Sequence, residues 1–422
     1  MKILINSTSC LLVYLLPLVL LTGPFLPDFF ICIVGILVTF LILKEKKYAY
    51  FNNNYFIIFI LFCTYIIIRS FFAQSIAISL EHSLFYFRFG LFAIAVWYLI
   101  ENNKTFIKNF SIFLLAAFIF ALADGYYQYF FEVNVFGFSW PGVRLSLPLN
   151  EKAILGGYLA RLFPLLLAVL IYTFDIKKFH VALILFILIL TDLLIFISGE
   201  RTALALLFLS TIFIVMFLSK YKKIRFYSFL VSILLMTLIA ALNPGIKERN
   251  IDKTINQLSG SSIESIISER GTERIVLFSN IHQSHILGAW RMFIDKPIVG
   301  QGPKMFRILC NDDEFSNEDP DTCSSHPHNL YMQLLSETGL LGLLFIIILC
   351  FSLIKLVINH ILLFIKKRET LLSDFQICLI ACLIMTLWPI IPSLNFFNNW
   401  MNVIFYLPIG FFLFSLNNKE KS

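Results

Sequence analysis

Four histidines in the long polar stretch of the chain could carry out proton chemistry, because imidazole changes charge near neutral pH. His326 and His328 lie two residues apart in "SSHPHNLYMQLL", and His282 and His285 lie upstream. One interpretation is general acid-base work, or orientation of a sugar hydroxyl. Two others are a metal pair that recruits Cys323, and a ring hydrogen-bonded at a helix N-terminus. No second ligand pair has the usual zinc spacing, so the sequence favours acid-base chemistry and predicts neither metal nor cofactor.

Arginines in three predicted outer connections could bind phosphate, since the planar guanidinium bonds two oxygens at once. Arg201 lies in the tight turn "ISGERTALALL", Arg144 and Arg161 lie in "VRLSLPLNEKAILGGYLARLFP", and Arg291 and Arg307 lie in the polar stretch. A structural interpretation of Arg201 is a turn whose arginine only reaches lipid head groups. Because these arginines are all predicted on the outer side of the membrane, we expect them to bind the diphosphate of a lipid together.

The elements that position these residues are membrane helices. Of the 422 residues 59% are hydrophobic and 14% are charged, and the mean hydropathy is +0.84. A soluble protein cannot bury this much apolar surface, so the net charge of +7 indicates membrane topology and not nucleic-acid binding. The first apolar run has no clear cleavage site, and we expect it to remain as a helix. About twelve spans are predicted, at 8–25, 27–44, 55–72, 84–101, 109–130, 154–174, 179–198, 202–219, 226–243, 331–358, 376–393 and 400–416.

The basic residues predict the orientation of these spans. They fall in every second connection and in the tail, at Lys44, Lys46, Lys47, Lys104, Lys108, Lys177, Lys178, Lys220, Lys222, Lys223, Arg225, Lys366, Lys367, Arg368, Lys419 and Lys421. Cytoplasmic loops carry the excess of lysine and arginine, so both termini are expected in the cytoplasm. The histidines and the outer arginines then share the opposite side.

Three parts follow from this arrangement: spans one to nine in residues 1–243, a large outer loop in 244–330, and spans ten to twelve with a cytoplasmic tail in 331–422. We expect the loop to be ordered and partly helical, because it mixes aromatic, basic and Gly-Pro elements. It also holds Cys310 and Cys323, whereas the other six cysteines lie in spans. The two are either free thiols or a disulfide, and the oxidising side of the membrane favours the disulfide.

Three motifs in order resemble the O-antigen ligase family, the Wzy_C-type superfamily of ligases and polymerases. "HPHNLYMQLLSETGLLGLL" is similar to the family's signature at His328, Asn329, Glu337 and the glycines that follow. "AWRMFIDKPIVGQGPKMFR" resembles the loop segment that precedes this signature, and "SGERTALAL" resembles the family's Ser-Gly-x-Arg-Thr turn. The motifs cover roughly the C-terminal half, and the hydropathy profile extends the similarity.

The resemblance implies an all-α polytopic membrane protein and a GT-C-type glycosyltransferase of the bacterial inner membrane, with its active site in the periplasm. Such an enzyme moves a glycan from undecaprenyl diphosphate to a sugar of lipid A core in lipopolysaccharide biosynthesis, with inversion and without metal or nucleotide sugar. By the same resemblance Arg201 would bind the diphosphate. His328, beside His326, would activate the acceptor hydroxyl or assist the leaving group, with Asn329 and Glu337 in support.

One position departs from the family pattern. Many members carry an arginine one helical turn before the tryptophan of the loop, where this chain has Ile286 beside His285. Arg291 or Arg307 could supply the missing charge, and His285 could take part of the role. An O-antigen polymerase and a protein O-oligosaccharyltransferase are alternatives within the superfamily. A transporter or flippase for lipid-linked glycans is an alternative of a different class, but the ionisable residues at one face and the lack of a repeat disfavour it.

Overall fold

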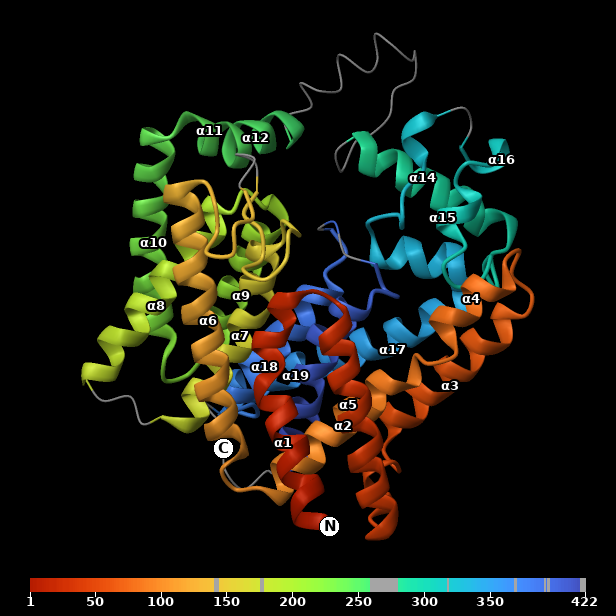
Figure 1. Cartoon of the computed structure of the whole chain (residues 1–422), viewed down its shortest axis with the longest axis horizontal. Helices are drawn as coiled ribbons and strands as arrows, with labels where there is room; N and C mark the ends of the chain where they lie inside the picture. The colour runs from red at the N-terminus through yellow and green to blue at the C-terminus, as the bar shows by residue number, and fades with distance from the viewer. Residues whose placement is uncertain are drawn as a thin grey trace.

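The computed structural model describes residues 1–139, 144–174, 178–258, 280–316, 319–367, 370–390, 392 and 395–417. Throughout these ranges the chain is helical, and its extended pairing is limited to two isolated β-bridges, Val133 with Ser139 and Leu147 with Asn150. Figure 1 shows a bundle of long helices with shorter helices at the end away from the N-terminus. The predicted all-α fold is therefore confirmed.

The helices follow the order of the predicted spans. The first ten are α1 (Lys2–Val19), α2 (Phe25–Lys44), α3 (Asn54–Ser70), α4 (Ile76–Ser83), α5 (Phe87–Asn102), α6 (Phe106–Phe131), α7 (Leu155–Thr173), α8 (Lys178–Ile197), α9 (Arg201–Phe217) and α10 (Lys222–Leu242). The polar segment forms α11 (Pro244–Lys247), a π-helix (Glu248–Asp252), α12 (Lys253–Leu258), α14 (Asn280–Asp295), α15 (Phe306–Leu309) and α16 (Asp313–Ser316). The chain closes with α17 (Leu330–Lys367), α18 (Asp374–Leu387) and α19 (Asn399–Asn417).

Among the described residues, eight helical segments are long and apolar enough to cross a membrane. Four shorter apolar helices accompany them, at Asn54–Ser70, Val181–Ile197, Arg201–Phe217 and Asp374–Leu387. Each of the twelve predicted stretches coincides with one of these twelve helices. A multi-pass membrane protein is thus supported, while the number of crossings stays a prediction.

The connections expected in the cytoplasm lie together at one end of the bundle. Lys47 lines the same pocket as Asn417, the last residue of α19. The hydrogen bonds that link these connections are Lys47–Asn102 (2.9 Å), Gln376–Ser415 (3.0 Å) and Ser219–Asp374 (2.7 Å). Four of the basic residues used for the topology, Lys177, Arg368, Lys419 and Lys421, lie outside the described residues. The grouping of the remaining connections agrees with the charge pattern.

Arg225 does not belong to this basic face, contrary to the sequence-based assignment. It is 1% exposed in α10 and donates to both carboxylate oxygens of Asp192 in α8, at 2.7 and 3.0 Å. It also donates to Thr211 of α9. Its guanidinium lies 4.4 Å from the centre of the Phe163 ring. A charge pattern does not reveal such a pair, because the carboxylate lies 33 residues upstream on another helix.

The predicted span 331–358 is not one continuous helix. The backbone of Gly339 has φ 64° and ψ −166°, which breaks α17 after a nine-residue segment, Leu330–Thr338. A Cβ atom at Gly339 would lie 2.3 Å from the carbonyl oxygen of Ile298, so only glycine fits this left-handed position. The residues after the histidines therefore form a separate short helix, and the membrane span begins at Leu340. Likewise α18 ends at Leu387, six residues before the predicted end at 393.

Backbone hydrogen bonds attach the polar segment to this break. The N–H groups of Gln301 and Gly302 donate to the carbonyl oxygens of Ser336 and Glu337, both at 2.8 Å, and Leu340 donates to Pro297 at 2.9 Å. From α3, Tyr65 donates to the carbonyl of Thr338 at 2.6 Å, and Arg69 donates to that of Gly300. These bonds fix the height of the histidine-bearing segment relative to the bundle.

Candidate functional site

The structure brings the four histidines of the polar segment together. His282 and His285 come from α14, and His326 and His328 come from the chain that leads into α17. The centre of the His328 ring lies 4.9 Å from the ring centre of His282, 5.3 Å from that of His285 and 4.0 Å from that of His326. Two segments about 40 residues apart in sequence thus form one cluster, with His328 at its centre.

Burial favours the neutral form of three rings in the cluster, those of His282, His285 and His328. Burial and the neighbouring His282 lower the pKa of both His285 and His328 to about 4. His285 is 4% exposed, and its Nδ1 atom has no hydrogen-bond partner in the structure. Burial also lowers the pKa of His282, and the positive charges of Arg201 and Arg144 lower it further. At neutral pH the cluster can therefore accept protons or hydrogen bonds.

Arginines surround the His282 edge of the cluster. Besides Arg144 and Arg201, Arg249 of the π-helix contributes, and its Nε atom donates to the carbonyl of Gly199 at 3.1 Å. Burial and the charges of Arg144 and Arg201 lower the pKa of Arg249, which shows that three like charges lie within electrostatic range. The sequence analysis missed Arg249, although its place directly after the ninth predicted span put it at the outer surface. Like charges held together favour an anionic ligand.

Glu200 fixes the turn that carries Arg201. Its carboxylate accepts the backbone N–H of Gly157 at 3.2 Å, at the N-terminus of α7, where an anion is favourable. Burial raises the pKa of Glu200 to about 7, while that hydrogen bond and nearby Arg144 oppose the rise. A Cβ atom at Gly156 would lie 2.2 Å from the Ser198 hydroxyl, so the glycine allows the turn to approach α7. This contact explains the pair of glycines at the start of the sixth predicted span.

Asn329 acts as the N-cap of the short helix after the histidines. Its side-chain oxygen accepts the N–H groups of Tyr331 and Met332, both at 3.1 Å, and its amide donates to Pro389 at 2.9 Å. The preceding residue, His328, has φ 53°, a left-handed conformation that is uncommon for a non-glycine residue and often marks a functional site. Asn329 therefore positions His328.

Glu337 is fully buried in the last turn of the same short helix. Its carboxylate accepts the N–H of Phe306 at 3.2 Å and an amide N–H of Gln333 at 3.0 Å. Lys304 lies near it, and burial lowers the pKa of Lys304 to about 8 against the effect of Glu337. Glu337 thus joins α15 to the helix that follows the histidines, and its proposed support of the site would act through this link.

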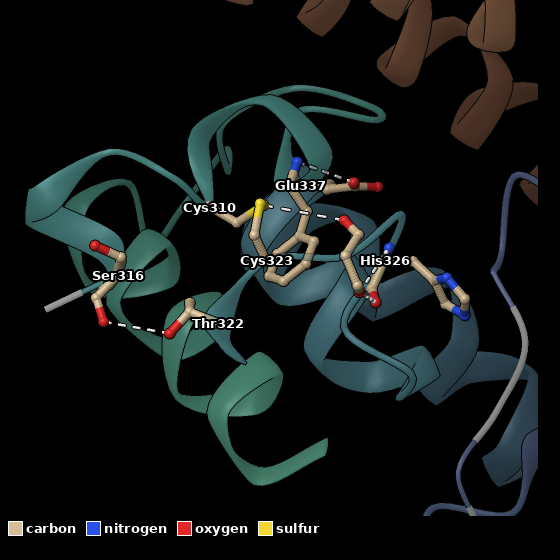
Figure 2. The surroundings of a disulfide bond; sticks show 8 residues. Cys310, Ser316, Thr322, Cys323, His326 and Glu337 are labelled. Atoms are coloured by element: carbon tan, nitrogen blue, oxygen red, sulfur yellow. Dashed lines mark hydrogen bonds between the residues drawn. A yellow bond between two sulfur atoms is a disulfide. The ribbon is translucent and has the colours of Figure 1, made fainter. Parts of the chain in front are cut away.

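The structure pairs Cys310 and Cys323 in a disulfide, with 4.9 Å between their Cα atoms (Figure 2). Next to it the Thr322 hydroxyl donates to the carbonyl of Ser316 at 3.2 Å. The chain runs from Cys323 to His326 in three residues, and the Ser324 hydroxyl donates to the carbonyl of His326. The covalent link therefore lies just ahead of the histidines.

Two of the arginines expected at the diphosphate lie elsewhere in the structure. Arg291 donates to the carbonyl oxygens of Phe315 and Ser316, at 2.8 and 3.2 Å, and so holds α16 against α14. Arg307 is exposed on α15, where its charge acts on Lys304. Among the described residues, no group of three or more histidine, cysteine, aspartate or glutamate side chains is arranged to hold a metal ion. The histidine cluster is thus a site of ring-to-ring contacts beside arginines.

These features define the class of the molecule as an all-helical, multi-pass membrane protein with a histidine and arginine site at one end of the bundle. A family model described as O-antigen ligase matches residues 183–347, a segment that contains Arg201, Arg249 and all four clustered histidines. This match supports a relation of the segment to the O-antigen ligase family, whose members are membrane glycosyltransferase-like enzymes of ligase or polymerase type. No curated protein matches the chain.

Proposed function

We propose that this protein is an O-antigen ligase that transfers a glycan from undecaprenyl diphosphate to a sugar of lipid A core. The observation that carries the proposal is the cluster of four histidines within electrostatic range of a group of arginines at one end of a membrane bundle. The anionic donor head needs the arginines, and the acceptor hydroxyl needs a group that can take a proton.

The position of the site supports the periplasmic face of the bacterial inner membrane. The basic connections gather at the opposite end of the bundle, which the positive-inside rule assigns to the cytoplasm. Near the site, exposed apolar side chains continue from the end of α14 onto α17, including Ile294, Ile298, Leu340 and Leu341. Such a stripe suits the head-group plane of a membrane. The donor diphosphate would lie at this plane.

In this proposal Arg201 and Arg249 bind the diphosphate together, with Arg144 close by. Arg249 would take the place of the family arginine that is Ile286 here, because it is the further guanidinium that the structure brings to Arg201. Neither Arg291 nor Arg307 is needed for this task. The negative charge of a bound diphosphate would offset the repulsion between the arginines. It would also favour protonation of the nearby His282.

His328 is proposed to accept the proton of the attacking sugar hydroxyl. The new bond joins the acceptor oxygen to the anomeric carbon of the donor, while the bond from that carbon to the diphosphate oxygen breaks. The electron pair leaves with the diphosphate, whose growing charge the arginines stabilise. Attack from the side opposite to the leaving group inverts the anomeric configuration. No metal takes part in this sequence, and His326, 4.0 Å from His328 between ring centres, helps to orient the base.

The direct test supplies purified protein, reconstituted in vesicles, with a glycan on undecaprenyl diphosphate and with either lipid A core or a second lipid-linked glycan. Glycan on lipid A core is the expected product. Longer glycans on the lipid carrier would instead identify a polymerase, and would overturn the acceptor assignment while leaving the donor site in place. Movement of the intact lipid-linked glycan without transfer would identify a transporter.

Single substitutions test the roles of the residues in the same assay. His328→Ala and Arg201→Ala are each expected to reduce transfer by about 100- to 10,000-fold, the range associated with loss of an acid-base group or of a charge-stabilising donor. Both variants should remain inserted and folded, as judged by size-exclusion chromatography. His82→Ala is a matched control, because His82 lies on α4 outside the cluster. Full activity of either site variant contradicts the mechanism.

A further inference from the structure

A cavity lies inside the bundle next to the histidine site. Helices α7, α9, α17, α18 and α19 line it, together with the connection between α18 and α19. The cavity is small, with about 40 Å³ of free space, and it is partly open. Its walls are mostly apolar, as Leu206, Ile346, Met385 and Phe405 illustrate, and its strongest polar group is Arg161.

Arg161 of α7 is buried without the partners that such a group normally has. It is 7% exposed, and its Nε atom has no hydrogen-bond partner in the structure. One terminal nitrogen donates a long bond of 3.4 Å to the carbonyl of Gly157 on its own helix. The nearest acid in electrostatic range is Glu200, whose carboxylate is bound by the N–H of Gly157. Arg161 therefore faces the cavity with unused donors.

A guanidinium in this position is costly. Ionisable groups inside a membrane bundle are normally paired or face a ligand, because an uncompensated charge loses its hydration. Glu200 attracts Arg161 at a distance, but its carboxylate forms no direct ion pair with the guanidinium and instead accepts the N–H of Gly157. An anion in the cavity would supply what Arg161 lacks.

The cavity begins directly beneath the site described above. Leu206 in its wall follows Arg201 by five residues on α9, a rise of about 7.5 Å. Leu330 in the opposite wall follows His328 by two residues. The cavity thus continues the site from the arginines and histidines into the interior of the bundle.

We propose that this cavity binds a phosphate group of a lipid substrate, with Arg161 as the contact to phosphate and with the acyl or prenyl chain leaving through the open side. The planar guanidinium can bond two phosphate oxygens, and the mostly apolar walls suit the start of a hydrocarbon chain. The inference rests on the proposed function, because that function supplies two lipids with phosphate groups, the polyprenyl diphosphate donor and lipid A.

Binding measurements on the full-length protein in nanodiscs test the proposal. The probes are undecaprenyl diphosphate, undecaprenol without phosphate, lipid A, and lipid A from which the phosphates have been removed. Arg161→Met removes the charge at similar volume, and Arg161→Lys keeps the charge but not the fork. Arg88→Met is the matched control, because Arg88 is already paired with Asp28 at 2.8 Å and does not line the cavity.

The Met variant is expected to bind one of the two phosphorylated lipids at least 10-fold more weakly, with the Lys variant intermediate and the phosphate-free probes unchanged. Loss with undecaprenyl diphosphate assigns the cavity to the donor, and loss with lipid A assigns it to the acceptor. Wild-type affinity of the Met variant for both phosphorylated lipids overturns the proposal.

Thermal unfolding without ligand separates binding from a merely structural role. Because Arg161 lacks a dedicated counter-ion, Arg161→Met should keep or raise the midpoint of the ligand-free protein and should lose the upward shift that the phosphorylated lipid gives to wild type. A lowered ligand-free midpoint with unchanged lipid affinity also overturns the proposal.

The cavity proposal and the proposed function can fail separately. If Arg201→Ala abolishes transfer while Arg161→Met binds both lipids normally, the cavity proposal fails and the ligase proposal stands. If wild type binds a phosphorylated lipid through Arg161 but transfers no glycan in any arm, the ligase proposal fails and the lipid site stands.

Discussion

Arg225 and Arg161 are both buried in the helix bundle, yet their surroundings differ. Arg225 donates to both oxygens of Asp192 and to Thr211, and Ser232 completes the network with a 2.8 Å bond to the same carboxylate. Arg161 has one long backbone bond and an Nε atom without a partner. The first arginine connects α8, α9 and α10, whereas the second borders a cavity.

The difference separates charges that stabilise the fold from charges that serve a ligand. A bidentate pair with every donor satisfied needs nothing more, and its removal harms the fold. A buried guanidinium with unused donors carries a desolvation cost that its own hydrogen bonds do not offset, which is why we propose a ligand for it. Burial alone does not distinguish the two arginines, because both are less than one-tenth exposed. The hydrogen-bond partners do.

The largest expected effect comes from breaking the satisfied pair. Asp192→Ala leaves Arg225 buried without its counter-charge, and we expect the free energy of unfolding to fall by about 3–5 kcal/mol. Chemical unfolding in mild detergent, followed by tryptophan fluorescence, measures this loss. Replacement of both partners, Asp192→Leu with Arg225→Met, should restore most of the stability, because no charge then remains unpaired. A single variant as stable as wild type would remove the contrast with Arg161.

A pH titration of stability sharpens the contrast at the histidine site. Unfolded histidine takes up a proton near pH 6.5, but folded His285 does so only near pH 4. The unfolded state therefore binds more protons between these values, so stability should rise with pH from about 4 to 6.5 and level off above that range. The slope is at most about 1.4 kcal/mol per pH unit for this residue. His285→Asn should reduce the slope by up to this amount, while His328, whose pKa is also lowered to about 4, keeps part of it. An unchanged slope would contradict the burial argument.

The smallest effect is expected from the disulfide. Reduction of Cys310–Cys323 loosens the chain ahead of His326, but the helix cap by Asn329 and the bonds from Phe306 to Glu337 remain. Transfer activity should fall only a few-fold, far less than with His328→Ala. Activity with and without reductant measures this, and Cys310→Ser/Cys323→Ser controls for off-target reduction. A loss as large as that of His328→Ala would place the disulfide in the site itself.

Much of this architecture follows from the sequence, because hydropathy and charge act along the chain. Twelve apolar stretches became twelve helices, and the grouping of basic connections at one end agrees with the charge pattern. The roles of single arginines could not be predicted in the same way. Arg225 was taken as a topology signal, and Arg249 was overlooked, since each depends on a partner from a distant helix or turn. The break at Gly339 was missed because a hydropathy window averages over many residues and hides the effect of one glycine.

The attachment of the polar segment to α3 means that the length of this helix sets the height of the segment above the opposite end of the bundle. Tyr65 and Arg69 hold the backbone of Thr338 and Gly300. Tyr65 and Arg69 lie 11 and 15 residues, about 16 and 22 Å of helix, from Asn54 at the opposite end of α3. The elevation of the histidines above the hydrocarbon is thereby coupled to bilayer thickness. A membrane of another thickness would change how far a lipid-borne sugar must rise to meet them, so lipid composition itself becomes a variable of the reaction.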